Sequence, residues 1–148
     1  GGFGSVSGTI AVAEHPADSS VEVVIDTASV STGDTDRDGH VKSADFLDVE
    51  NHPDMKFVST AVRANGSSWT LDGDLSIKGV TKPVSLEFDF VGLATDPWGN
   101  QKAAFSAITT LNREDWNLNW NVALETGGVL VSKKVDIEIE MQAVPANG

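Results

Sequence analysis

The chain has 148 residues, of which 10 are Lys or Arg and 22 are Asp or Glu, so its formal charge at pH 7 is −12. This balance argues against nucleic acids and anionic membrane surfaces as partners, because both bind cationic faces. The chain has no Cys, which excludes disulfides, thiol catalysis and thiolate metal sites. No run of about 18 apolar residues occurs, so we expect no membrane span.

The length suits a single domain with one hydrophobic core over residues 1–148. The chain opens with GGFGSV, without Met and without an apolar signal segment. We therefore expect a processed or trimmed chain. The sequence does not fix its compartment, whether periplasmic, secreted or cytoplasmic.

Apolar and polar residues alternate with a period of two along most of the chain, which predicts β-strands. In the runs 69–78, 84–90 and 135–141, one face is apolar and the other is polar, mostly acidic. This pattern is typical of an antiparallel sheet with one side in water. The predicted strands lie near residues 3–13, 19–30, 56–64, 68–78, 83–94, 101–112 and 129–143, and short helices near 42–48 and 113–118.

Antiparallel strands with one apolar face need a sandwich or a barrel to bury that face. Long neighbouring strands joined by tight turns favour an all-β, up-and-down, lipocalin-like barrel of seven to eight strands. The interior of such a barrel is filled by side chains or holds one small ligand. The alternation alone leaves both alternatives open.

The stretch DTDRDGHVKSAD, residues 34–45, matches much of the calcium loop of an EF-hand. The matching residues are Asp34, Asp36, Asp38, Gly39 and Asp45. An EF-hand loop lies between two helices, whereas a strand pattern precedes this loop. Lys42 places a cation beside the supposed ion. We interpret the loop as a polar cap on a short helix that begins at Lys42 or Ser43, and keep a calcium-stabilised barrel as the weaker alternative.

The grouping of His40, Ser43 and several acids invites comparison with hydrolases. No G-x-S-x-G elbow surrounds Ser43, and the three histidines, His15, His40 and His52, lack the spacing of a zinc site. No set of residues supplies a nucleophile, a base and a group that orients the base. We therefore predict no enzyme, no catalytic residues, and neither a cofactor nor a resident metal.

Six segments resemble, in order, the landmarks of the YceI-like family. They are TGDTDRDGHVKSADF (32–46), LDVENHPDMKFVST (47–60), LSIKGVTKPVSL (75–86), DPWG (96–99), TTLNREDWNLNWN (109–121) and GGVLVSKKVDIEIEMQA (127–143). The resemblance runs from Phe3 to Ala143. It implies a lipocalin-like barrel of a bacterial family that binds a long isoprenoid, such as a polyprenyl phosphate or a quinone-like lipid, in its apolar lumen for transport or storage.

The resemblance also implies a polar collar that meets the head group of the ligand. The residues that match the family motif there are Arg37, Asp38, His40, Ser43, Asp45 and Phe46. Arg37 would bind a phosphate through two hydrogen bonds, helped by His40 and Ser43. Asp38 and Asp45 would orient Arg37 and cap the helix. Asp34, Asp36 and Gly39 complete the EF-hand pattern but are not part of the family motif.

The chain of the lipid would lie against the inward phase of each strand. The predicted lumen residues are Val23, Ile25, Phe57, Leu71, Leu75, Ile77, Leu86, Phe88, Phe105 and Leu111. Trp98, Trp116 and Trp120 lie in or beside loops, where an amphipathic ring can line a mouth. For each of these residues, ordinary core packing is the alternative interpretation.

Three departures from the family pattern concern the start of the chain, Leu47 and Asn117. A first strand with an H-S-x-V-x-F type pattern is missing, which leaves seven strands of eight and an unpaired edge that invites pairing with a second copy. A homodimer through this edge, or a self-associating fragment without lipid, is therefore a further alternative. Leu47 replaces a common Phe. Asn117 replaces a common Gly, and we expect the turn to persist because Asn tolerates a left-handed backbone.

Overall fold

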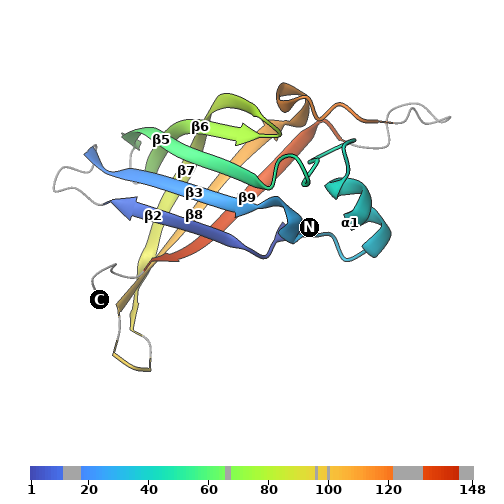
Figure 1. Ribbon diagram of the computed structural model, residues 1–148. Helices are drawn as coiled ribbons and strands as arrows, with labels where there is room; N and C mark the ends of the chain where they lie inside the picture. The colour runs from blue at the N-terminus through green and yellow to red at the C-terminus, as the bar shows by residue number, and fades with distance from the viewer. Residues whose placement is uncertain (12–17, 66–67, 96, 100, 122–131, 144–148) are drawn as a thin grey trace.

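The computed structural model describes residues 1–11, 18–65, 68–95, 97–99, 101–121 and 132–143. Seven antiparallel strands form one curled sheet in the order β2-β3-β5-β6-β7-β8-β9, and β1 pairs with β4 beside it (Figure 1). The strands are β1 (Gly2–Phe3), β2 (Val6–Ala11), β3 (Ser20–Asp26), β4 (Val30–Ser31), β5 (Asp54–Asn65), β6 (Ser68–Ile77), β7 (Val80–Thr95), β8 (Gln101–Asn112) and β9 (Lys134–Ala143). Within the described residues β2 and β9 each pair on one side only, so the sheet is a curled half-barrel.

The seven-stranded antiparallel sheet confirms the predicted fold class. Two predicted strands are divided: the first becomes β1 and β2, and the second becomes β3 and β4. The break after β3 comes at Thr27, whose buried hydroxyl donates to the carbonyl oxygens of His52 and Pro53, both at 2.8 Å. Asp26 caps the 3-10 turn η2 (Thr27–Ser29) by accepting from the N–H of Ala28 at 3.0 Å, and this local bond favours the turn over a continuing strand. Residues 12–13 and 129–131 of the predictions lie outside the described residues.

The predicted helix over residues 42–48, starting at Lys42 or Ser43, is wrong. Helix α1 spans Thr35–Lys42, and Ser43 ends it instead of starting it. The cause is Asp34, whose Oδ1 accepts hydrogen bonds from the backbone N–H groups of Asp36 (3.0 Å) and Arg37 (3.1 Å). These bonds satisfy N–H groups that have no partner within the helix, so Asp34 caps a helix that begins at Thr35, seven residues before the predicted start at Lys42.

The predicted helical turn near residues 113–118 is confirmed as the 3-10 helix η3 (Arg113–Trp116). Asn112 caps its start by accepting from the N–H of Glu114 at 3.0 Å. Asn117 ends it in the left-handed region with φ 61°, as expected for Asn in the place of Gly.

The hydrophobic core lies on the concave face of the sheet. Its buried members are Val21, Val23, Val30, Leu47, Met55, Phe57, Leu71, Leu75, Ile77, Leu86, Ala107, Leu111, Trp116 and Leu118. Gly73 belongs to the same face, and a Cβ there would lie 2.4 Å from the ring of Phe57. The core therefore depends on a glycine at this position for the close approach of the ring.

Two β-bulges keep apolar residues on the concave face. The register shifts by one residue between Ser59 and Ala61 in β5, and between Phe90 and Gly92 in β7. After the second bulge Leu93 pairs with Ala103, which shares its face with Phe105. An inserted residue reverses the alternation, so the apolar residues on both sides of each bulge face inward.

Consecutive antiparallel pairing divides the connections between two ends of the sheet (Figure 1). The collar end carries α1, η3 and the tight β6–β7 turn at Lys78 and Gly79. The opposite end carries the β5–β6 and β7–β8 hairpins. The β7–β8 hairpin extends beyond the body of the sheet. We call residues 92–102 the arm, of which the structure describes 92–95, 97–99 and 101–102. None of the described helices is both long and apolar enough to cross a bilayer.

Candidate functional site

The strand register places all ten predicted lumen residues in the inward phase. Seven of them are buried, and Ile25, Phe88 and Phe105 are half-buried. The rings of Phe88 and Phe105 stack with centroids 5.1 Å apart and an interplanar angle of 19°. The concave face is thus a packed apolar floor with aromatic surface still accessible where β7 meets β8.

The two open edges expose further apolar surface of the same face. Val6 on β2 is 50% exposed, and Val135 on β9 is 41% exposed. Ile137 and Ile139 of β9 pack partly against the core. These side chains point to the concave side because Val6 pairs with Ile25, and Ile139 pairs with Ala107. Part of the apolar face is therefore accessible at the β2 and β9 edges.

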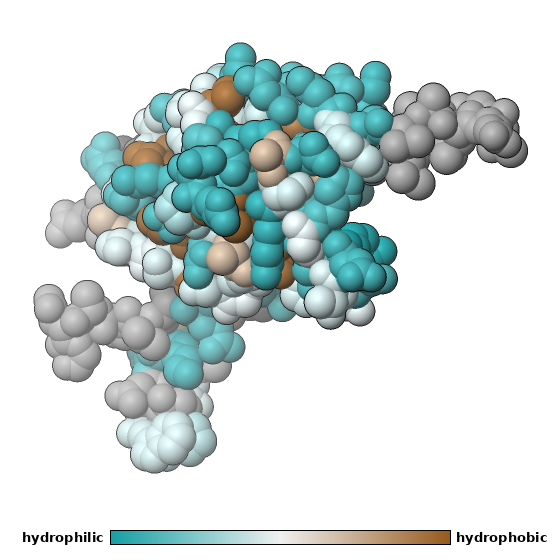
Figure 2. Space-filling view, turned by 45° about the vertical axis from the view of Figure 1, so that its right-hand side comes forward, coloured by the Kyte–Doolittle hydropathy of each residue, from teal (hydrophilic) through white to brown (hydrophobic). Residues whose placement is uncertain are grey.

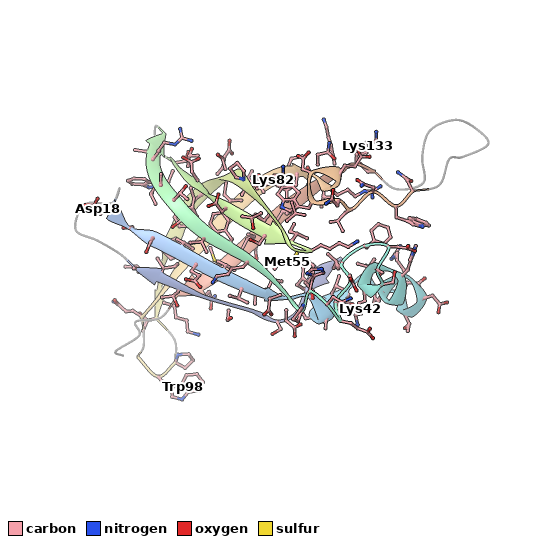
Figure 3. All side chains as sticks on the ribbon, turned by 45° about the horizontal axis from the view of Figure 1, so that its top comes forward. Asp18, Lys42, Met55, Lys82, Trp98 and Lys133 are labelled. Atoms are coloured by element: carbon pink, nitrogen blue, oxygen red, sulfur yellow. The ribbon has the colours of Figure 1, made fainter. Side chains whose placement is uncertain are left out.

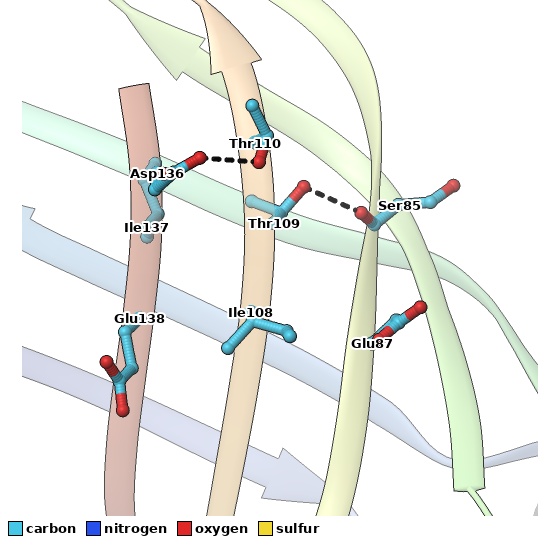
Figure 4. Close-up of a pocket in the computed structure, with 8 residues that line it drawn as sticks. All are labelled: Ser85, Glu87, Ile108, Thr109, Thr110, Asp136, Ile137 and Glu138. Carbon is cyan, nitrogen blue, oxygen red and sulfur yellow. Dashed lines mark hydrogen bonds between the residues drawn. The ribbon is translucent and has the colours of Figure 1, made fainter. Parts of the chain in front are cut away.

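A cavity of about 530 Å³ lies elsewhere, between β7, β8 and β9 (Figure 4). Its lining residues are Ser85, Glu87, Ile108, Thr109, Thr110, Asp136, Ile137 and Glu138. There β7 and β8 diverge, and the Thr109 hydroxyl donates to the Ser85 carbonyl at 2.9 Å where the strand pairing has stopped. Three carboxylates line this cavity, so it does not suit an apolar chain, and the concave face remains the candidate lipid site.

Arg37 and Asp38 of the predicted collar are bonded to the segment that precedes α1. The Arg37 guanidinium donates from Nε to the Thr32 hydroxyl (2.9 Å) and from Nη2 to the Thr32 carbonyl (2.7 Å). Asp38 Oδ1 accepts from the Thr32 N–H at 2.7 Å and from the Thr32 hydroxyl. The hydroxyl bond from Thr32 is the main reason that the pKa of Asp38 lies below its usual value. Both side chains thus have a local structural task.

The other collar residues form an aromatic cluster. The rings of His40 and Trp120 meet edge to face at 4.4 Å, and Phe46 lies 5.0 Å from His40 and 5.4 Å from Trp120. The Asp45 carboxylate lies 2.9 Å from His40 Nε2, and the Ser43 hydroxyl donates to the His40 carbonyl at 2.6 Å. The structure therefore brings Trp120 to the collar and fixes His40 from both sides.

Arg113 is a buried residue of this region that the sequence interpretation missed. Its Nε donates to the Ser132 carbonyl at 2.9 Å, and its Nη1 donates to the Leu118 carbonyl. Its Cζ lies 5.8 Å from the centroid of the Phe46 ring, within cation–π range. A lone Arg in a polar run gave no signal of burial. Its bonds tie η3 to Leu118 and to Ser132, which lies two residues before β9.

The three tryptophans proposed for a mouth occupy three different environments. Trp116 is 2% exposed, and its indole N–H donates to the Leu75 carbonyl at 3.0 Å, so it closes the collar end of the core. Trp120 is half-buried in the aromatic cluster. Trp98 is 83% exposed at the tip of the arm, far from the collar (Figure 3).

Lys82 is a second residue that the sequence interpretation missed. It pairs with Leu75, so it lies in the inward phase of β7 near the collar end, and it is exposed. The predicted strand began at residue 83, which left Lys82 in a turn, whereas β7 begins at Val80. The alternation of Val80, Lys82 and Val84 was the signal that could have found it.

The acidic residues of the EF-hand pattern do not form a calcium loop. Most of residues 34–45 form a helix, in which Asp34 caps the N-terminus, Asp38 bonds to Thr32 and Asp45 bonds to His40. Among the described residues no group of three or more His, Asp and Glu side chains is arranged to hold a metal ion. The geometry therefore gives the calcium-stabilised barrel no support.

The sequence model of the YceI-like domain matches residues 1–143. The chain belongs to the YceI-like family. It is 38% identical over 145 residues to Protein YceI of Escherichia coli O6:H1, covering 97% of this chain and 73% of that protein. It is 42% identical over 119 residues to a UPF0312 protein of Pectobacterium atrosepticum, covering 80% of this chain and only 62% of that protein.

Solved YceI structures have the same fold. The YceI protein of Campylobacter jejuni superimposes with a TM-score of 0.81 at 26% identity, over 97% of this chain and 83% of that one. Burkholderia cenocepacia BcnA superimposes with a TM-score of 0.77 at 24% identity, over 96% of this chain and 86% of that one, which supports the fold alone. The YceI-like family is a family of binding proteins, and its fold supports a lipid-binding barrel in general terms.

Proposed function

We propose that this YceI-like chain binds a long-chain isoprenoid lipid, such as a polyprenyl phosphate or a quinone-like lipid, for transport or storage. The observation that carries the proposal is the apolar concave face, on which Phe88 and Phe105 remain half-buried. Each buried CH₂ contributes about 0.8 kcal/mol, so an isoprene unit contributes on the order of 3 kcal/mol before ordering costs. A few units suffice for tight binding without polar contacts.

Mass spectrometry of an organic extract of the purified protein, beside native mass spectrometry of the intact chain, tests the proposal directly. We expect one isoprenoid per chain. Phe88→Ser should lower the occupancy, whereas Ile108→Ser, which removes an exposed apolar side chain from the outer face of β8, should not. An empty wild-type chain that also fails to take up added polyprenyl phosphate and quinone would contradict the proposal.

The head group of the ligand would lie near the collar end, where two cations are candidates. Arg37 matches the family motif but is engaged with Thr32, whereas Lys82 lies in the inward phase of β7. We expect Arg37→Ala or Lys82→Ala to weaken binding of a phosphorylated isoprenoid more than binding of the free alcohol. Equal losses for both ligands with both variants would remove the phosphate from the proposal.

The open edges favour self-association as a second property. Strands β2 and β9 each carry unpaired backbone groups along one side within the described part of the chain, and such edges pair readily with another chain. We propose that two copies pair through one of these edges. Light scattering across a range of protein concentrations should show a dimer. A monomer at high concentration would contradict this proposal without affecting lipid binding.

A further inference from the structure

We propose that the arm, residues 92–102, docks onto the surface of a zwitterionic lipid bilayer. Such docking would let a lipid pass between the bilayer and the concave face, and this transfer rests on the proposed function. The docking itself rests on the arm alone. Its position, its exposed side chains and its charge each support the proposal.

The arm presents apolar side chains away from the body of the molecule. Trp98 is 83% exposed at the tip, and Leu93 is 68% exposed on β7. They are the two most exposed large hydrophobic side chains among the described residues. Figures 1 and 3 show the hairpin extending past the other strands, with Trp98 pointing outward from its end. Tryptophan favours the interface between head groups and acyl chains, because its ring is apolar and its N–H is polar.

The apolar surface of the arm is continuous with the concave face. The bulge between Phe90 and Gly92 restores the inward phase, so Leu93 lies in the same row as the half-buried Phe88. Across the pair, Ala103 and Phe105 of β8 continue this row. In a regular strand of the same sequence, without a bulge, strict alternation would turn Leu93 to the outer face. A lipid chain leaving a bilayer at the arm would meet apolar side chains along the way to the Phe88–Phe105 stack.

The arm is electrically neutral on a strongly acidic protein. Its residues contain one Asp, Asp96, and one Lys, Lys102, so its formal charge is zero, and the other residues carry the whole charge of −12. The neighbouring strand segments carry the acidic side chains Asp89, Glu138 and Glu140. Figure 2 shows hydrophilic residues over most of the visible body. An anionic bilayer would repel this body, whereas a zwitterionic one would not. The charge distribution therefore selects a zwitterionic surface.

Flotation with phosphatidylcholine vesicles, using the full chain, measures the docking. Leu93→Ser combined with Trp98→Ser should reduce the vesicle-bound fraction on the order of tenfold, because binding of a surface-seated element scales with its buried apolar area. The matched control is Val58→Ser with Ile108→Ser, which removes two exposed apolar side chains from the outer face. It should leave the bound fraction unchanged. Circular dichroism confirms that both variants fold.

Vesicle composition and salt give an independent test. Replacing a third of the lipid with phosphatidylglycerol should weaken binding at low salt, and added salt should restore it by screening the repulsion. Binding to phosphatidylcholine should change little with salt. Absence of vesicle binding by the wild-type chain, or equal binding by both double variants, would overturn the proposal.

Two further measurements separate this proposal from the others. If Trp98 mediates contact with a second copy instead, light scattering without vesicles will show an oligomer that the arm variant loses, and the membrane assignment is overturned. Extracts of the arm variant should still contain lipid, with slower uptake from vesicles. Vesicle binding by a wild-type chain that never holds lipid would contradict the proposed function and leave the docking standing.

Discussion

The two ends of the curled sheet use tryptophan in opposite ways. At the collar end, Trp116 is 2% exposed and donates its indole N–H to the Leu75 carbonyl. At the arm end, Trp98 is 83% exposed on a hairpin that extends past the body. One end is closed by packing, a buried arginine and an aromatic cluster, while the other presents apolar side chains to solvent. The contrast separates a packed collar end from an arm end where large apolar side chains stay accessible.

The largest expected effect comes from truncating each tryptophan. Trp116→Ala should lower the free energy of unfolding by about 3–5 kcal/mol, because it leaves a cavity in the core and removes the partner of the Leu75 carbonyl. Trp98→Ala should change it by less than about 0.5 kcal/mol, since the side chain is exposed. Urea denaturation of both variants checks this, and equal losses would erase the distinction between the ends.

Between the two ends, a pair of glycine substitutions tests how tightly the core on the concave face is packed. Gly73→Ala should destabilise the protein by about 1–3 kcal/mol, because the new Cβ would lie 2.4 Å from the Phe57 ring. The control is Gly39→Ala in α1, where the Cβ meets nothing within 4 Å and should stabilise the helix by about 0.5–1 kcal/mol. We expect the melting temperature to fall for Gly73→Ala and to rise for Gly39→Ala. An unchanged melting temperature for Gly73→Ala would show that the core beside Phe57 is packed more loosely.

At the collar end, Asp34 tests whether α1 depends on its cap. Asp34→Ala removes the acceptor for the N–H groups of Asp36 and Arg37 and should cost about 1 kcal/mol. The acids of the EF-hand pattern do not form a metal site. The melting temperature of the wild type and of this variant should therefore be the same in millimolar calcium as in chelator. A calcium-dependent rise in the wild type that Asp34→Ala abolishes would restore the metal alternative.

The smallest expected effect concerns a surface pair nearer the arm end. Asp72 accepts from Arg63 Nε (2.7 Å) and Nη2 (2.9 Å) and from the Ser85 hydroxyl (2.6 Å). The pKa of Asp72 is lowered to about 2, mainly by the hydrogen bonds from Arg63 and then by the bond from Ser85. The carboxylate therefore stabilises the fold above its ordinary pKa of about 3.9, and this stabilisation is lost as the pH falls toward 2.

The measurement is the melting temperature of wild type and Asp72→Asn between pH 6 and pH 2. The wild type should be the more stable at pH 6, and the gap should narrow below about pH 4. A small gap is expected because the pair is partly exposed and solvent screens it. A gap that stays constant across the whole range would show that Asp72 acts through shape and not through its charge.

The sheet was predictable because its signal is local. A strand with one wet face alternates with a period of two, and the runs around Leu71, Leu86 and Ile137 show that alternation directly. The predicted inward residues all fall on the concave face for the same reason. The start of α1 was missed because the EF-hand pattern drew attention to the acids as ligands, whereas Asp34 acts as a helix cap.

The site was only partly predictable because its assembly depends on contacts distant in sequence. His40 and Trp120 are 80 positions apart, and no local pattern indicates that their rings meet at 4.4 Å. Likewise Trp98 and Trp116 both lie near turns, and only the order of the strands separates them to opposite ends. Lys82 was not predicted as an inward residue because the predicted strand begins at residue 83, three residues after the start of β7 at Val80.

The two bulges also bear on how chain length can vary among relatives. A residue gained or lost inside an ordinary strand turns every later side chain to the other face, which would place apolar residues in water. Next to Thr60 and Val91 the register already accommodates one extra residue, so a deletion there would straighten the strand and leave the facing of its neighbours unchanged. In an alignment of relatives, single-residue gaps within the strands should therefore gather at these two positions.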